Sequence, residues 1–187
     1  IFQLTRLGTV CLQTGRLDEG ASHLQRSLHI ATERRNSRGI GASQAALAWY
    51  WLERGDPEQA ELLARSACDH LGIQTAFVRA AQGFLCRSLL AQGRVDEADA
   101  LADQIDQDGG AIDFEAEHLQ TIVAVRGAAG GPDAGKQALQ RCLGRLASIH
   151  ARLRTPALRH SFLAQRPVHE LLSLAMRLDL DTATLVP

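Results

Sequence analysis

Aromatic residues and lysine are scarce in this chain of 187 residues. Phe, Tyr and Trp together account for 4% of it, and Lys136 is its only lysine. Alanine and leucine dominate instead, and this bias favours helices over sheets because these side chains lose little rotamer freedom in a helix. Charged residues make up 22% and hydrophobic residues 45%, as in an ordinary globular protein.

The chain also lacks a surplus of positive charge and a long apolar run. The formal net charge is -1, so the composition gives no bulk attraction to nucleic-acid phosphates or to an anionic membrane surface. The longest unbroken apolar run, Ala45–Leu52, is far shorter than the ~20 residues of a membrane-spanning helix. No charged leader opens the chain, which begins at Ile1 rather than Met. We therefore expect a cytoplasmic fragment of a longer protein, without direct nucleic-acid or membrane contact.

The four cysteines and seven histidines form no familiar disulfide or metal motif. The cysteines lie far apart without a C-x-x-C pair, which favours small buried side chains in a reducing compartment over a disulfide framework. Neither H-E-x-x-H nor a Cys–His pair at zinc-finger spacing occurs. No Ser-His-Asp or Cys-His set can be placed together. The sequence thus predicts no metal, no cofactor and no catalytic residue, and a protein that is not an enzyme.

Three stretches of the chain align as internal repeats. They read RLGTVCLQTGRLDEGASHLQRSL, AALAWYWLERGDPEQAELLARSA and GFLCRSLLAQGRVDEADALADQI. Each is an apolar-periodic helix, a glycine turn, and a second helix that opens with acidic residues, which the helix dipole favours there. The turn glycines Gly15, Gly55 and Gly93 are 40 and 38 residues apart, and Gly130 continues the series after 37 more. We predict that the turn glycine ends the first helix in the left-handed conformation that glycine adopts without strain.

The repeated positions resemble those of the tetratricopeptide repeat, whose period is about 34 residues. In the first unit Gly8 and Gly20 occupy the family's small-residue positions, and Cys11 its usual aromatic position, which Trp51 and Leu89 hold in the next two units. The resemblance implies an all-α fold, a right-handed α–α superhelix of about four helical hairpins plus closing helices at the C-terminus. The predicted units span about residues 1–36, 37–74, 75–110 and 111–154, with a closing segment over 155–187, all in one domain.

Helical periodicity and cap residues give the expected helices. In the closing segment, Thr155-Pro156 is a cap followed by Pro at the first helical position, and Pro167 opens the last helix. That helix carries one apolar stripe, as expected of a segment that covers the final hairpin: Val168, Leu171, Leu172, Ala175 and Leu178. The main helices are expected near 1–14, 17–34, 38–54, 57–70, 75–92, 95–107, 113–129 and 132–154.

The long repeat spacing and the closing sequence RHSFLAQRPVHELLSLA resemble the repeat arrays of large bacterial signalling regulators. In those proteins an ATPase or kinase-like module, a DNA-binding domain or a nucleotide cyclase domain is joined to such an array. The resemblance implies the sensory or regulatory repeat region of a bacterial transcriptional or signalling regulator. Its partner would be a protein or peptide ligand, or another domain of the same polypeptide. A free-standing adaptor or assembly scaffold is the alternative, and the sequence leaves the oligomeric state open.

In this family the first helix of each unit lines a concave groove, and the resemblance carries that surface over by position. Trp49 and Trp51 are two residues apart and cannot share a helix face, so we expect Trp51 in the core and Trp49 in the groove. Trp49 and Arg87 are the predicted anchors, because Trp and Arg anchor interfaces most often. A Trp49 packed on a neighbouring helix and a solvated Arg87 are the alternatives. The predicted partner-binding residues are Phe2, Thr9, Leu12, Ala42, Trp49, Leu52, Glu53, Arg87 and Leu90.

Members of the family that bind chaperones hold a C-terminal carboxylate with a set of lysines, asparagines and arginines in this groove. Apart from Arg87, this chain lacks that set at the corresponding positions. The predicted lining is largely apolar, so we expect an amphipathic helix or an extended peptide in it rather than a chaperone tail.

The segment Gly130–Lys136 fits the G-x-x-x-x-G-K pattern of a phosphate-binding loop. A working loop follows a strand and needs Ser or Thr after the lysine to hold Mg²⁺, but Gln137 stands there. The apolar residues upstream also recur at helical spacing. We predict a turn between helices here, and a nucleotide-binding domain is the second alternative function.

The segment QIDQDGGAIDFE resembles an EF-hand calcium loop at Asp106, Asp108, Gly109 and Glu115. The first ligand of such a loop is normally Asp, but it is Gln104 here, and losing that carboxylate removes both a direct ligand and a charge. We predict an acidic turn between two units, without calcium.

Overall fold

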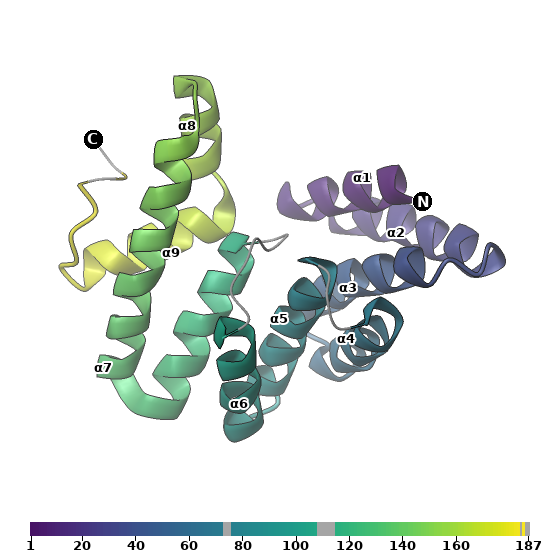
Figure 1. Ribbon diagram of the computed structural model, residues 1–187, viewed down its shortest axis with the longest axis horizontal. Helices are drawn as coiled ribbons and strands as arrows, with labels where there is room; N and C mark the ends of the chain where they lie inside the picture. Colours follow the sequence, from purple (N-terminus) through teal and green to yellow (C-terminus); the bar gives the residue numbers. More distant parts are fainter. Residues whose placement is uncertain (73–75, 108–114, 184, 186–187) are drawn as a thin grey trace. The chain divides into compact units, whose positions relative to one another are not determined.

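The computed structural model describes residues 1–72, 76–107, 115–183 and 185, which form two compact units, Ile1–Glu115 and Ala116–Pro187. The regular structure of these residues is all helical, which confirms the predicted fold class, while the single domain over 1–187 stays a prediction. None of the described helices is both long and apolar enough to cross a membrane. The helices are α1 (Phe2–Gln13), α2 (Leu17–Glu33), α3 (Ser37–Glu53), α4 (Pro57–Leu71), α5 (Ala76–Ala91), α6 (Val95–Gln107), α7 (Glu115–Arg152), α8 (Pro156–Leu163) and α9 (Arg166–Arg177) (Figure 1).

One turn geometry closes the three hairpins of the first unit. Gly15, Gly55 and Gly93 have φ of +78°, +77° and +76°, which confirms them as left-handed helix ends. In each turn the N–H of the following residue reaches back to a carbonyl in the last turn of the first helix. Arg16 N–H donates to Cys11 O at 2.8 Å, and the equivalent bonds of the second and third turns measure 3.0 and 2.9 Å. This is the Schellman motif, and it reverses the chain over a few residues.

Helices of the first unit pack in chain order, each on the next, with α3 also in contact with α1 and α5 (Figure 1). Within the first hairpin α1 and α2 approach closely at two glycines. A Cβ on Gly20 would lie 2.8 Å from the Gly8 carbonyl oxygen, so a larger residue would push the helices apart. The predicted small-residue positions are therefore packing requirements of the hairpin.

The outer face of α1 is exposed, whereas the same face of α3, the equivalent helix of the second hairpin, is covered by α2. In α3, Leu47 and Tyr50 are 5% and 9% exposed, because α2 packs on this helix. The Tyr50 hydroxyl donates to Asp18 Oδ1 of α2 at 3.3 Å. At the same repeat positions of α1, Leu7 and Val10 are 43% and 47% exposed. This face of the first helix of a hairpin is therefore buried by the preceding hairpin, and not by the second helix of its own hairpin.

The second unit begins with a bent helix. Inside α7, Gly131 has φ +77° and ψ −174°, and the chain doubles back there (Figure 1). The predicted turn glycine was Gly130, so the prediction was wrong by one residue; Pro132 follows Gly131 and its fixed φ suits the start of a new helical segment. A Cβ on Gly135 would lie 3.0 Å from the Gly127 Cα, so the two halves of α7 pack closely beside the turn.

The closing segment completes the core of this unit. Thr155 caps α8 by accepting the Leu158 N–H at 3.2 Å, which confirms the predicted cap. The predicted apolar stripe of α9 is confirmed at four positions, but Leu178 is 36% exposed because α9 ends at Arg177. The buried residues from α7, α9 and the segment after α9 form one cluster: Ala116, Leu119, Val123, Ala138, Leu139, Cys142, Leu143, Leu146, Val168, Leu171, Leu172, Ala175 and Leu185.

An ion-pair network joins the second hairpin to the third. Glu61 of α4 accepts from Arg65 at 2.7 Å, from Gln92 at 2.8 Å and from Arg94 at 2.8 Å, and the last two belong to the turn between α5 and α6. Partial burial acts to raise the pKa of the Glu61 carboxyl. The hydrogen bonds from Gln92, Arg65 and Arg94 outweigh it and hold that pKa below its usual range.

We expect Glu61→Gln to lower the free energy of unfolding by about 1–2 kcal/mol at neutral pH, because charge-assisted hydrogen bonds are lost. The folded-state pKa of Glu61 lies below the unfolded one, so the carboxylate stabilises the protein above the unfolded pKa, and this contribution is lost as pH falls through the folded pKa. Urea denaturation from neutral to acidic pH should therefore show a smaller loss of stability in the variant than in the wild type. Glu58→Gln, an exposed position on the same helix, is the control. Equal pH dependence for wild type and Glu61→Gln would contradict the prediction.

Candidate protein-binding groove

A groove of about 520 Å³ lies between α1 and α3 and reaches the start of α5. We call it the α1–α3 groove. Its walls combine apolar side chains, short polar side chains and two arginines, and none of the described residues that line it is acidic. The lining residues are Phe2, Thr5, Arg6, Thr9, Val10, Gln13, Arg38, Ala42 and Phe77.

Three of the predicted partner-binding residues line this groove. Phe2 is 40% exposed at its rim, whereas Thr9 and Ala42 are buried in its walls. The Thr9 hydroxyl donates to the Thr5 carbonyl at 2.8 Å, so its polar atom is satisfied within α1. Leu12 is 3% exposed and belongs to the core of the hairpin rather than to the groove.

One lining residue of the groove, Thr5, belongs to a buried cluster of hydroxyl groups. Ser43 Oγ of α3 donates to Ser27 Oγ of α2 at 3.0 Å, and Ser27 Oγ in turn donates to the Ile1 carbonyl at 3.0 Å. Thr5 Oγ1 of α1 lies 2.9 Å from Ser27 Oγ. The cluster ties three helices together with bonds of fixed geometry, and satisfied buried polar groups of this kind specify one arrangement of the helices.

The predicted anchor Trp49 lies inside the array. It is 5% exposed, and its ring stacks on Phe84 of α5 with a centroid distance of 5.9 Å and an interplanar angle of 10°. Its Nε1–H donates to Glu53 Oε1 at 3.1 Å. Trp51, expected in the core, is only partly buried, so the structure has the alternative in which Trp49 packs on a neighbouring helix. The physical reason is that α5 packs on α3 and places an aromatic ring opposite Trp49.

The remaining predicted residues lie on the last turns of α3 and α5. Arg87 Nη2 is 3.7 Å from Glu53 Oε1, and their side chains are 28% and 15% exposed. Leu52 and Leu90 are partly buried on the same two helices. The structure thus places three of the predicted residues in the α1–α3 groove, Leu12 in the core of the first hairpin, and the others on α3 and α5. Partner binding by any of them remains a prediction.

Residues that the sequence reasoning missed complete the rim of the groove. The Arg38 guanidinium lies 5.6 Å from the Phe2 ring centroid and 5.5 Å from that of Phe77, and the two rings are 6.4 Å apart. At these distances the guanidinium cation of Arg38 is attracted to the faces of the two aromatic rings. Arg38 and Phe77 precede the first predicted residues of their units, Ala42 and Arg87, so carrying over motif positions could not find them.

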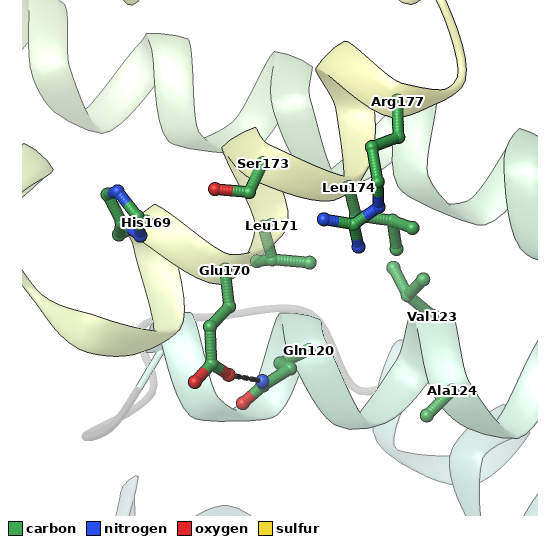
Figure 2. A pocket seen from close by; sticks show the side chains of 9 residues that line it. All are labelled: Gln120, Val123, Ala124, His169, Glu170, Leu171, Ser173, Leu174 and Arg177. Carbon is green, nitrogen blue, oxygen red and sulfur yellow. Dashed lines mark hydrogen bonds between the residues drawn. The ribbon is translucent and has the colours of Figure 1, made fainter.

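A second pocket, of about 550 Å³, lies within the second unit between α9 and the first half of α7. Figure 2 shows Glu170 of α9 accepting a hydrogen bond from Gln120 of α7 at its edge. Glu170 also pairs with Arg166 at 2.9 Å. The sequence reasoning missed this pocket. A row of polar residues, His169, Ser173 and Arg177, recurs every four residues on the side of α9 opposite its apolar stripe. This row was the sequence feature from which the pocket could have been predicted.

The two motif-like segments fare differently. Gly130–Lys136 contains the bend of α7, and the residues before it, from Glu115, are helical rather than a strand. The segment therefore has the predicted helical context and lacks the strand on which a phosphate-binding loop depends. The EF-hand-like segment lies outside the described residues at Asp108 and Gly109, and the prediction about calcium there stays a prediction.

Comparison with known families agrees with the hairpin geometry. Residues 1–71, which hold α1 to α4, match a model of the tetratricopeptide repeat, and residues 79–104 in α5 and α6 match a second tetratricopeptide repeat model. No curated protein matches the chain. Residues 1–104 therefore carry tetratricopeptide repeats and form a protein–protein interaction module. The fourth unit predicted over 111–154 lies outside both matches.

We expect Trp49→Ala to lower the free energy of unfolding by about 3–4 kcal/mol, because it removes a buried ring and leaves a cavity beside Phe84. Trp49→Phe should retain most of the stacking and cost less. Urea denaturation measures the difference, with Arg87→Ala, a partly exposed position on α5, as a control that should change stability by about 1 kcal/mol or less. A stable Trp49→Ala protein would contradict the assignment of Trp49 to the core.

Proposed function

We propose that the interaction module of residues 1–104 binds an acidic, partly apolar peptide segment in the α1–α3 groove. The observation that carries this proposal is the composition of the groove, where Arg6 and Arg38 are the charged residues among the described residues that line it. Electrostatic complementarity selects partners of the opposite charge, so an acidic segment suits these walls. The exposed ring of Phe2, with Phe77 beside it, offers apolar contact to a side chain of the same segment.

Arg38 is the residue on which selection for a carboxylate depends. Its guanidinium is held against two aromatic rings, which restrains the long side chain before a partner arrives. Arginine presents its N–H donors in a planar fork that matches a carboxylate. A restrained donor loses less conformational entropy on binding, so a carboxylate at this rim would bind more tightly than at a freely moving arginine.

The wider context of this proposal is a large bacterial regulator. The array would be its sensory or regulatory region in the cytoplasm, and the bound segment would come from a partner protein or from another domain of the same polypeptide. The support is the spacing of 40 and 38 residues between turn glycines and the closing sequence over 155–187. A free-standing adaptor that uses the same groove is the alternative.

The proposal includes no catalytic activity for this chain. A nucleotide-binding role for Gly130–Lys136 has little support, because the glycines there serve the bend and the close packing of α7. Gln137 also replaces the hydroxyl residue that would hold Mg²⁺.

A random peptide library selected against the 187-residue chain should enrich sequences with Asp or Glu next to an aromatic or aliphatic residue. Fluorescence polarisation with the consensus peptide should show at least about tenfold weaker binding to Arg38→Glu, which corresponds to ~1.4 kcal/mol. Arg34→Glu makes the same charge change on an exposed position outside the groove and is the matched control. An enriched pool without acidic residues, or equal weakening by both variants, would overturn the proposal.

The regulator context predicts the length of the native polypeptide. Mass spectrometry and sequencing of the protein from its source should show a much longer chain that carries a nucleotide-binding, cyclase or DNA-binding module. A native chain little longer than 187 residues would reject the regulator and leave the adaptor, without affecting the prediction for Arg38.

A further inference from the structure

The first hairpin brings three metal-binding side chains together. Sγ of Cys11, one carboxylate oxygen of Glu19 and one ring nitrogen of His23 all lie within 4.8 Å of one another. Cys11 comes from α1, and the other two come from the first two turns of α2. The nearest approach of His23 Nε2 to Glu19 Oε1 is 3.9 Å. Among the described residues this is the group of donors close enough to share one ion.

We infer that Cys11, Glu19 and His23 form a site for a divalent transition-metal ion, with Zn²⁺ as the best match. One thiolate, one imidazole and one carboxylate are the three kinds of ligand that Zn²⁺ takes in proteins. Tetrahedral bonds of about 2.0–2.3 Å require donors about 3.3–3.8 Å apart, so the present cluster must contract by roughly 1 Å. Glu19 and His23 lie on the surface of α2, with 49% and 28% of their side chains exposed, and have room to make that movement.

Three protein donors would leave the fourth position of a tetrahedral ion to another ligand. Cys11 is fully buried and forms the base of the site, whereas the other two donors stand at its mouth. The ion would therefore enter from the side of Glu19 and His23 and keep a water molecule or a partner's ligand on its outer side. As the sulfur–metal bond forms, the Cys11 thiol releases its proton to solvent.

The other hairpins provide an internal comparison. At the positions of Cys11, Glu19 and His23, the second hairpin has Trp51, Gln59 and Leu63, and the third has Leu89, Glu97 and Leu101. Hairpin packing therefore does not require metal ligands at these positions. The close approach of Gly8 to Gly20 also brings together α1 and α2, the two helices that carry the three donors.

One neighbouring cation competes with the metal. Arg16 Nη1 lies 3.1 Å from Glu19 Oε2 and 3.3 Å from Oε1, so the carboxylate is paired before any ion arrives. A metal ion would displace this exposed ion pair, which is of the kind that contributes little to stability. Removing the guanidinium should consequently strengthen metal binding, which a purely structural role for the cluster would not predict.

Cobalt(II) titration of the reduced 187-residue chain tests the inference, with Zn²⁺ as the competing ion. We expect one Co²⁺ per chain, with a thiolate-to-cobalt charge-transfer band that Zn²⁺ abolishes, and a rise in Tm when Zn²⁺ is added. Cys11→Ser should abolish the band. His23→Leu and Glu19→Gln, which introduce the residues of the second hairpin, should each weaken Co²⁺ binding at least about tenfold. Arg16→Gln should strengthen it several-fold.

Cys68→Ser is the matched control, because Cys68 is the partly exposed cysteine of the chain. Burial, and then the neighbouring charge of Asp69, raises the pKa of its thiol to about 11, so it is a poor thiolate at neutral pH. No charge-transfer band in the wild type, or a band that Cys68→Ser removes, would overturn the inference. Should Cys11→Ser fail to fold, unchanged Co²⁺ binding by the surface variant His23→Leu would overturn it equally.

Discussion

The close approach of the two helices within a hairpin is the constraint on which the first unit depends. A Cβ on Gly8 would lie 2.9 Å from the Gly20 carbonyl oxygen, so no larger residue fits at this crossing. In the second hairpin Ala48 and Ala60 hold the same positions and are fully buried. Hairpins closed in the same way by small residues can stack in a constant register. That register places the first helices α1, α3 and α5 side by side, where all the predicted binding residues lie.

The size of the side chains along these first helices then decides where the array is closed and where it is open. Between α3 and α5 the stacked rings of Trp49 and Phe84 fill the space. Between α1 and α3 the facing residues are short, as at Thr9 and Ala42, and the α1–α3 groove remains. Trp49, the aromatic residue predicted for the binding surface, is thus buried by packing, and Phe2 is the exposed ring at the rim of the groove.

The turns could be predicted from the sequence, because each depends on residues a few positions apart. Gly15, Gly55 and Gly93 adopt the left-handed conformation that only glycine adopts freely, and this local rule fixed the hairpins almost to the residue. The burial of Trp49 could not be predicted in the same way. A motif position says which face of its own helix a residue occupies, but Phe84, which covers it, is 35 residues further along the chain. The helix face that lines the groove could therefore be predicted, but the place along the array where the groove is open could not.

The difference between local pattern and folded structure also applies to two candidate ligand sites, Gly130–Lys136 and the group around Cys11 and His23. Gly130–Lys136 has the spacing of a phosphate-binding loop, but a helix and not a strand precedes it, and its glycines have structural roles in α7. Gly131 makes the bend, and Gly135 lets the two halves of α7 touch at Gly127. Cys11 and His23 show the reverse, since their spacing of 12 residues matches no metal motif and only the hairpin joins them. A spacing acquires chemical meaning from the elements that carry it, so a motif is best judged together with the helices or strands that hold its residues.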